Sequence, residues 1–285
     1  MGLRAGDRPG GVGGEVGGEA GAERGVRDPG EQPVLPGEVR EQATRIGAVV
    51  EAEGGGRSLA AGCLSIFVQF FALFGFIFIV LQYLQLIRGD SGLLSAVSML
   101  PMAATMMPTA RLAPALVSRL GAARVCTTGL VLIAAAMAVL SQLTPASGYW
   151  LLAIGLVVLG AGMGLATTPA TSGITAALPA AQQGVGSALN DLSRETGGAV
   201  GIAVLASVLT AAYQSHLTLA HVPAAQADLA RCSVAAATRM GGGVAVHAQL
   251  AFADGMRLAL LITAGIVAAA AVTVAALMRQ AAPRP

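Results

Sequence analysis

Three charged side chains, Asp191, Arg194 and Glu195, stand together in an otherwise apolar stretch of the chain. Spacings of three and four residues put them on one face of a helix. Charges at membrane depth are costly unless they are paired or face water, and they often serve proton relays and substrate pathways. Asp191 can pair with Arg194, which leaves Glu195 as an acid without an assigned partner. The group therefore predicts either proton or substrate transfer, or an ion network that gates the bundle.

The position of this group within its span separates the two alternatives. The apolar pattern predicts a span over 187–213, so the three residues lie within about two turns of its start. Water and the snorkelling of long side chains are available near a membrane surface. This position favours the structural or gating role over the relay.

Polar side chains also occur in the first predicted span, at Gln69, Gln82, Tyr83 and Gln85. Polar groups within a span usually turn toward the interior of a helix bundle. These four could line a substrate cavity or hydrogen-bond a neighbouring helix, and both alternatives stay open. The phenylalanines of the same span favour lipid contact and packing over an aromatic drug pocket.

Two glycine pairs mark expected helix contacts. Gly160 with Gly164, and Gly197 with Gly201, each fit the small-xxx-small pattern that lets helix backbones approach closely in membranes. We expect tight packing at both pairs, and an interface that slides during a conformational change is compatible with it.

The elements that position these residues follow from composition. The chain is 55% hydrophobic and 11% charged, whereas soluble domains have about 25% charged residues. A bilayer span needs about 20 apolar residues. The pattern predicts an all-α membrane protein with about six transmembrane helices, at 59–87, 91–110, 125–143, 149–178, 187–213 and 258–278.

The rest of the chain divides around this domain of 58–279. Residues 1–57 carry 17 of the 32 charged side chains and are rich in Gly, Glu and Arg, a composition typical of disorder. Residues 214–256 are expected to form an outer loop. The arginines near the spans predict cytoplasmic termini and a multi-pass plasma-membrane protein. They are Arg57, Arg111, Arg119, Arg124, Arg279 and Arg284.

No residue pattern supports an enzyme. The histidines and cysteines match no metal-ligand spacing, and the chain carries no nucleotide-binding loop or triad order. We expect no catalytic residues, no metal or other cofactor, and no nucleic-acid partner. The expected partner is the lipid bilayer.

Three stretches carry a family resemblance. AGCLSIFVQFFALFGFIFIVLQYLQ and the LGAGMGLATTPATSGITAALPAAQQGVGSALNDLSRETGGAVGIAVLASVL stretch resemble late helices of the fourteen-helix drug:proton antiporters of the major facilitator superfamily. ARLAPALVSRLGAARV resembles that superfamily's cytoplasmic loop motif. The resemblance covers about residues 60–279 and corresponds to the C-terminal six-helix half.

The resemblance implies export of small lipophilic or cationic molecules in exchange for protons, with the proton gradient as the energy source. It also implies two three-helix repeats of inverted topology, 59–143 and 149–278. The family motifs map onto Arg119, Gly121 and Arg124 in the loop, and onto Asn190, Asp191, Arg194, Glu195 and Gly198 in the fifth span.

The resemblance covers only one half of such a transporter. We therefore expect a truncated chain that is not competent alone and needs the missing N-terminal half or a homodimer. Residues 1–57 do not resemble the family, which favours a shifted or wrong start over native coding sequence. The alternative function is that of a non-transporting membrane accessory subunit that packs against other helices.

Overall fold

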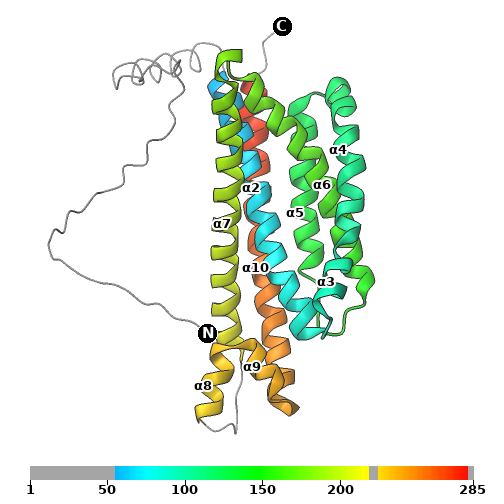
Figure 1. Ribbon diagram of the computed structural model, residues 1–285, viewed down its shortest axis with the longest axis vertical. Helices are drawn as coiled ribbons and strands as arrows, with labels where there is room; N and C mark the ends of the chain where they lie inside the picture. Colours follow the sequence, from blue (N-terminus) through cyan, green and yellow to red (C-terminus); the bar gives the residue numbers. More distant parts are fainter. Residues whose placement is uncertain (1–54, 218–223, 282–285) are drawn as a thin grey trace, which may run out of the picture. The chain divides into compact units, whose positions relative to one another are not determined.

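The computed structural model describes residues 55–217 and 224–281, and within these ranges the regular structure is entirely helical (Figure 1). The expectation of disorder for 1–57 lies outside the described residues, apart from Gly55–Arg57, which begin the first described helix. The elements are α2 (Gly55–Gln82), η1 (Tyr83–Ile87), α3 (Gly92–Ser98), α4 (Leu100–Leu120), α5 (Ala122–Leu140), α6 (Tyr149–Ala176), η2 (Ala180–Gln182), α7 (Gln183–His216), α8 (Ala224–Cys232), α9 (Val234–Arg239) and α10 (Gly242–Ala281).

Six of the described helical segments are long and apolar enough to cross a bilayer, which confirms the predicted all-α membrane class. They are Gly56–Ile87, Gly92–Leu120, Ala122–Leu140, Tyr149–Ala176, Ala180–His216 and Gly242–Gln280.

Local sequence signals set the helix junctions. Gly121, at a φ of 85°, adopts a backbone conformation that other residues rarely reach, and it joins α4 to α5 in a single residue. Ser91 begins α3, because its hydroxyl accepts the Leu94 N–H at 3.2 Å. Pro101 lies in the first turn of α4, where its missing N–H costs nothing.

Most contacts among the long helices follow an approximate symmetry, although α7 packs on α10 far more extensively than α4 packs on α5. α2 packs along α7 as α6 packs along α4, α5 contacts α6 as α10 contacts α2, and α5 pairs with α10 (Figure 1). Exchanging α2 with α6, α4 with α7 and α5 with α10 turns each of these contacts into itself or into another contact of the same set. Because three of the spanning segments precede α6, α6 runs opposite to α2. The arrangement fits two three-helix repeats of inverted topology.

The interior is apolar and closely packed. Ile66 and Phe76 of α2, Ile133 and Met137 of α5, and Leu156 of α6 are fully buried in one continuous cluster. In a bilayer such contacts stabilise the bundle through packing rather than through exclusion of water. The spanning segment that contains α4, Gly92–Leu120, is the least enclosed of the six, because only 11% of its most apolar stretch is buried.

The two largest differences from the predicted boundaries are in the second span and the outer loop. The second span was expected to end at residue 110, but α4 continues to Leu120 and includes Arg111 and Arg119. The outer loop was expected over 214–256, yet α7 extends to His216, α8 and α9 lie within the loop, and α10 begins at Gly242. Both differences have one cause, because charged residues limit a membrane span without ending the helix that carries it. Alanine, frequent in 244–253, has the highest helix propensity.

Candidate functional site

The contact between α2 and α7 positions the charged group. A Cβ at Gly197 would overlap the carbonyl oxygen of Phe67, and one at Gly201 would overlap that of Phe71. Only glycine therefore fits at either position, and the two backbones lie against each other. This contact fixes the rotation of α7 about its axis, which decides where Arg194 and Glu195 point.

A groove follows this helix contact on the exposed side. Its volume is about 320 Å³. Phe70 and Phe74 of α2 form one wall, with ring centroids 6.0 Å apart. A Cβ at Gly198 would come within 2.9 Å of the Phe74 ring, so this glycine lets the ring lie against α7. Arg194, Glu195, Ala199 and Ile202 complete the lining.

Arg194 contacts an aromatic ring instead of forming the expected ion pair with Asp191. Its guanidinium carbon lies 5.0 Å from the centroid of the Phe70 ring, within cation–π range. The ion pairs among the described residues join Arg88 to Asp90 and Arg231 to Asp228. A pair between Asp191 and Arg194 was therefore the wrong expectation. The ring on α2 attracts the guanidinium, while the Asp191 side chain is exposed on α7.

Glu195 is exposed and lines the groove, whereas Asp191 is exposed outside it. α7 begins at Gln183, not near 187, so Glu195 lies twelve residues into the helix, a rise of roughly 18 Å. Glu195 therefore lies about three turns from the start of the helix, in the first half of its 34 residues. The predicted distance of about two turns from the membrane surface stays a prediction, because the start of the helix does not mark that surface. Inside a membrane, such a carboxylate needs a cation, a proton or water beside it.

Asn190 lies on a different face of α7. Its side chain is buried, and the Thr171 hydroxyl of α6 donates to its Oδ1 at 3.4 Å. Among the described contacts, this residue joins helices and does not reach the groove.

The four polar residues of α2 and η1 separate into different environments. Gln69 is buried; Thr167 of α6 donates to its Oε1 at 2.8 Å, and its Nε2 donates to Ser65 at 2.9 Å. Of its two alternatives, Gln69 therefore fits the helix-joining one. Gln82 lines a separate cavity of about 240 Å³ beside α7 and α9, and Gln85 is exposed.

Tyr83 belongs to a polar cluster at the end of the bundle where α5 joins α6. It is buried, and its hydroxyl donates to the Thr144 carbonyl at 2.8 Å. Arg88 donates to the Ser147 carbonyl at 3.3 Å and pairs with Asp90 at 3.5 Å. Tyr83 thus joins η1 to the turn between α5 and α6 through its hydrogen bond.

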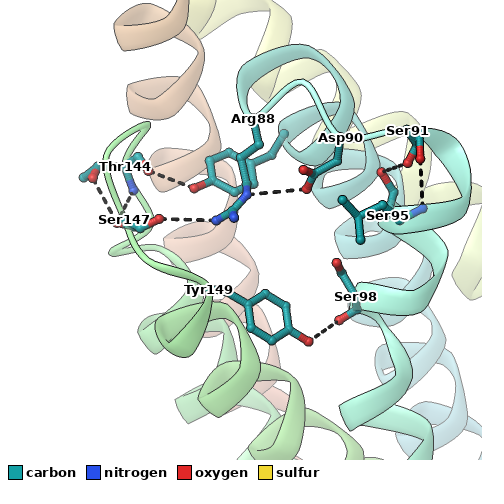
Figure 2. Close-up of polar contacts among 10 residues, drawn as sticks. Arg88, Asp90, Ser91, Ser95, Ser98, Thr144, Ser147 and Tyr149 are labelled. Atoms are coloured by element: carbon teal, nitrogen blue, oxygen red, sulfur yellow. Dashed lines mark hydrogen bonds and ion pairs between the residues drawn. The ribbon is translucent and has the colours of Figure 1, made fainter.

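A second contact in the same region involves the start of α6. The Tyr149 hydroxyl donates to the Ser98 carbonyl at the end of α3, at 3.1 Å (Figure 2). Its bond to α3 depends on the meeting of two segments about fifty residues apart, which no local pattern signals.

The second glycine pair and the loop motif lie elsewhere. A Cβ at Gly160 would overlap the Met102 carbonyl oxygen, and one at Gly164 would overlap the Thr109 hydroxyl, both on α4. In the loop motif, Arg119 and Arg124 are exposed on either side of Gly121. None of these residues borders the groove.

Sequence reasoning missed Phe70 and Phe74 as part of the site, because the span contains six phenylalanines and no local pattern distinguishes these two. The available signal was their spacing of four residues, which places them on one helix face. Among the described residues, His, Cys, Asp and Glu side chains gather in no group that could hold a metal ion.

Comparisons with known proteins support a transport assignment. The chain is 33% identical over 199 residues to the multidrug efflux pump LfrA of Mycolicibacterium smegmatis, covering 68% of this chain and 38% of that protein. It is 31% identical to the tetracenomycin C resistance and export protein of Streptomyces glaucescens, over 52% of this chain and 27% of that protein. It is 29% identical to the methyl viologen resistance protein SmvA of Salmonella typhimurium, over 62% and 36% respectively.

The matches therefore span about a third of the length of these relatives. No protein-family profile matches the chain. The fold and the matches together define a polytopic helical membrane protein. They confirm the resemblance to drug-efflux proteins of the major facilitator superfamily, over part of their length.

Proposed function

We propose that this six-helix unit forms one half of a proton-coupled efflux transporter for lipophilic cations. The observation that carries the proposal is the groove between α2 and α7. It combines two aromatic rings with an exposed carboxylate in the first half of a helix long enough to span a membrane. The functions for which two of the relatives are named, multidrug efflux and methyl viologen resistance, support the same substrate class.

The groove suits a flat aromatic cation. Phe70 and Phe74 offer ring faces and edges for stacking, and Glu195 offers a negative charge beside them. The guanidinium of Arg194 already lies over the Phe70 ring and would repel a substrate cation placed on the same ring. We therefore assign the substrate cation to the side of Glu195 and Phe74.

Proton coupling follows from the chemistry of one carboxylate. A proton and a cation cannot both be held by Glu195, because protonation removes the charge that attracts the cation. Binding of a proton from the outside then favours release of the cation, and loss of that proton on the inside favours its capture. This competition produces exchange with the proton gradient as the energy source.

The exposed apolar faces of α4 and α7 support a second helical unit beside this one. Leu100, Met107 and Leu112 on α4, and Leu192 and Val200 on α7, are all at least 43% exposed. Such a unit would cover the open side of the groove. It could come from a longer form of the chain, from a partner chain or from a second copy in a homodimer.

The proposed setting is the plasma membrane with both chain ends cytoplasmic. Arg119 and Arg124 flank the junction where α4 joins α5, and basic residues favour the cytoplasmic side. Arg111 lies in the middle of α4, on the chain before this junction. An accessory role without transport remains the alternative, supported by the same exposed faces of α4 and α7.

The test is ethidium efflux from cells that express the chain, compared with a Glu195→Gln variant. Asp191→Asn is the matched control, because it also removes one exposed carboxylate from α7 but does not border the groove. Energy-dependent efflux that Glu195→Gln loses and Asp191→Asn keeps would support the proposal. Equal loss in both variants would contradict the assignment of Glu195. Absence of efflux from wild type, in membranes that contain the chain, would mean that the chain is not a transporter by itself and is either a half that needs its partner or an accessory subunit.

A further inference from the structure

A second groove lies between α5 and α10, away from the helices that form the α2–α7 groove. It consists of two cavities that share Thr127, Val131 and Arg279. The first, of about 420 Å³, lies at the end of the bundle where α5 begins and α10 ends. The second, of about 510 Å³, continues along the two helices.

The two parts of the groove differ in chemistry. The first part contains the exposed side chains of Arg124 and Arg279, and neither cavity is lined by an acidic residue. Alanines line the second part, between the exposed side chains of Val131 and Val272. Because alanine side chains are small, they leave a furrow between the two valines. The alanines are Ala134, Ala268, Ala271, Ala275 and Ala276.

The length of the groove matches one leaflet of a bilayer. From Arg279 to Ala268 α10 rises eleven residues, or roughly 16 Å. The hydrocarbon core is about 30 Å thick, so one leaflet measures about 15 Å. The arginine pair therefore lies at headgroup level when the alanine end of the groove reaches the bilayer centre.

We propose that this groove holds an anionic phospholipid, with its phosphate at Arg124 and Arg279 and one acyl chain along the alanine-lined part. Two arginines and no acidic lining residue select a negative headgroup. A protein partner fits less well, because the groove offers no tryptophan or tyrosine anchor. Free phosphate would leave the alanine-lined part empty.

The threonine hydroxyls that line the first part of the groove are not free to donate hydrogen bonds to the phosphate. Thr127 donates to the Ala123 carbonyl at 2.7 Å, and Thr128 donates to the Arg124 carbonyl at 2.8 Å. Since both hydrogens are already used within α5, the arginines must supply the donors. The site thus depends on charge, and removal of the two guanidinium groups should remove its selectivity.

The test is native mass spectrometry of the purified chain with equimolar phosphatidylglycerol and phosphatidylcholine of identical acyl chains. Wild type should retain phosphatidylglycerol preferentially, by roughly thirtyfold if each arginine contributes as surface arginines do. The Arg124→Gln, Arg279→Gln variant should bring this ratio close to one. The control is Arg111→Gln with Arg119→Gln, which removes two equally exposed charges that border neither cavity and should keep the wild-type ratio.

A second variant tests the acyl-chain part without touching charge. Ala268→Trp fills the far end of the groove and should lower retention of phosphatidylglycerol several-fold. Ala269→Trp, at the adjacent exposed position outside the lining, should not. Equal retention of the two lipids by wild type, an equal loss in both arginine variants, or unchanged retention in Ala268→Trp would overturn the proposal.

Discussion

The guanidinium carbon of Arg194 on α7 lies 5.0 Å from the centroid of the Phe70 ring on α2. Its Nε is buried and has no hydrogen-bond partner within the described part of the chain. The ring therefore provides the main contact for this charge. Phe70, Arg194 and Glu195 all border the groove.

This contact predicts a measurable coupling between the two residues. Arg194→Gln and Phe70→Leu should each destabilise the chain, and the double variant should lose less than the sum of the two. The expected coupling is about 0.5 to 2 kcal/mol. A double-mutant cycle on the free energy of unfolding in detergent measures it. Strictly additive losses would show that the ring does not hold the guanidinium.

The glycine contact between α2 and α7 predicts that a glycine-to-alanine substitution lowers the stability of the bundle at the contact but not at a glycine that faces open space. Gly201→Ala should destabilise the bundle by more than about 2 kcal/mol, because the new methyl group overlaps the Phe71 backbone and the helices must separate. Gly265→Ala in α10 meets open space and should be neutral or stabilise by about 0.5 to 1 kcal/mol. Thermal unfolding of both variants in the same detergent is the measurement. A Gly201→Ala protein as stable as wild type would refute the close contact.

The buried amide of Gln69 predicts a loss of stability without loss of any ligand contact. Gln69→Leu breaks the bonds to Thr167 and Ser65 and should cost about 0.6 to 1.7 kcal/mol, the range found for hydrogen bonds between membrane helices. Gln85→Leu, at an exposed position of the same segment, is the control and should change little. If Gln69 lined the substrate site instead, ethidium binding would fall while the free energy of unfolding stayed the same.

The hydrogen bond of the Tyr83 hydroxyl predicts that the backbone amides of the α5–α6 turn are protected from hydrogen exchange. Tyr83→Phe removes the bond to the Thr144 carbonyl, a loss of about 1 kcal/mol. Hydrogen exchange in residues 144–148 should then become faster, while exchange in the middle of α5 stays as in wild type. Tyr149→Phe, which loses the bond to Ser98, should speed exchange near the end of α3 instead. Unchanged exchange in both turns would contradict the role of this cluster.

The class of the fold could be predicted from the sequence, since six long apolar stretches leave few alternatives to a helix bundle. The ends of the helices could not. α10 continues through Asp254 and Arg257 because helix formation depends on local backbone propensity, whereas hydropathy reports only the part that enters the bilayer. The same distinction explains why α4 extends past Arg111.

The candidate site was predicted only in part. Glu195 and Arg194 stand out in a sequence because charges are rare in membrane spans. Their partners depend on how α7 is rotated against α2, which the Gly197 and Gly201 contacts determine in three dimensions. A helical pattern on α7 alone favours Asp191 as the partner of Arg194. The ring of Phe70 replaces it because a second helix lies within reach.

The most direct test of the account is equilibrium binding of ethidium to the purified chain in lipid nanodiscs. We predict that wild type binds the dye, because its groove combines the rings of Phe70 and Phe74 with the Glu195 carboxylate. Glu195→Gln should bind the dye weakly, and Asp191→Asn should follow wild type. Dye binding that is absent from wild type, or that Glu195→Gln leaves unchanged in strength, would contradict the claim that this groove holds the cation.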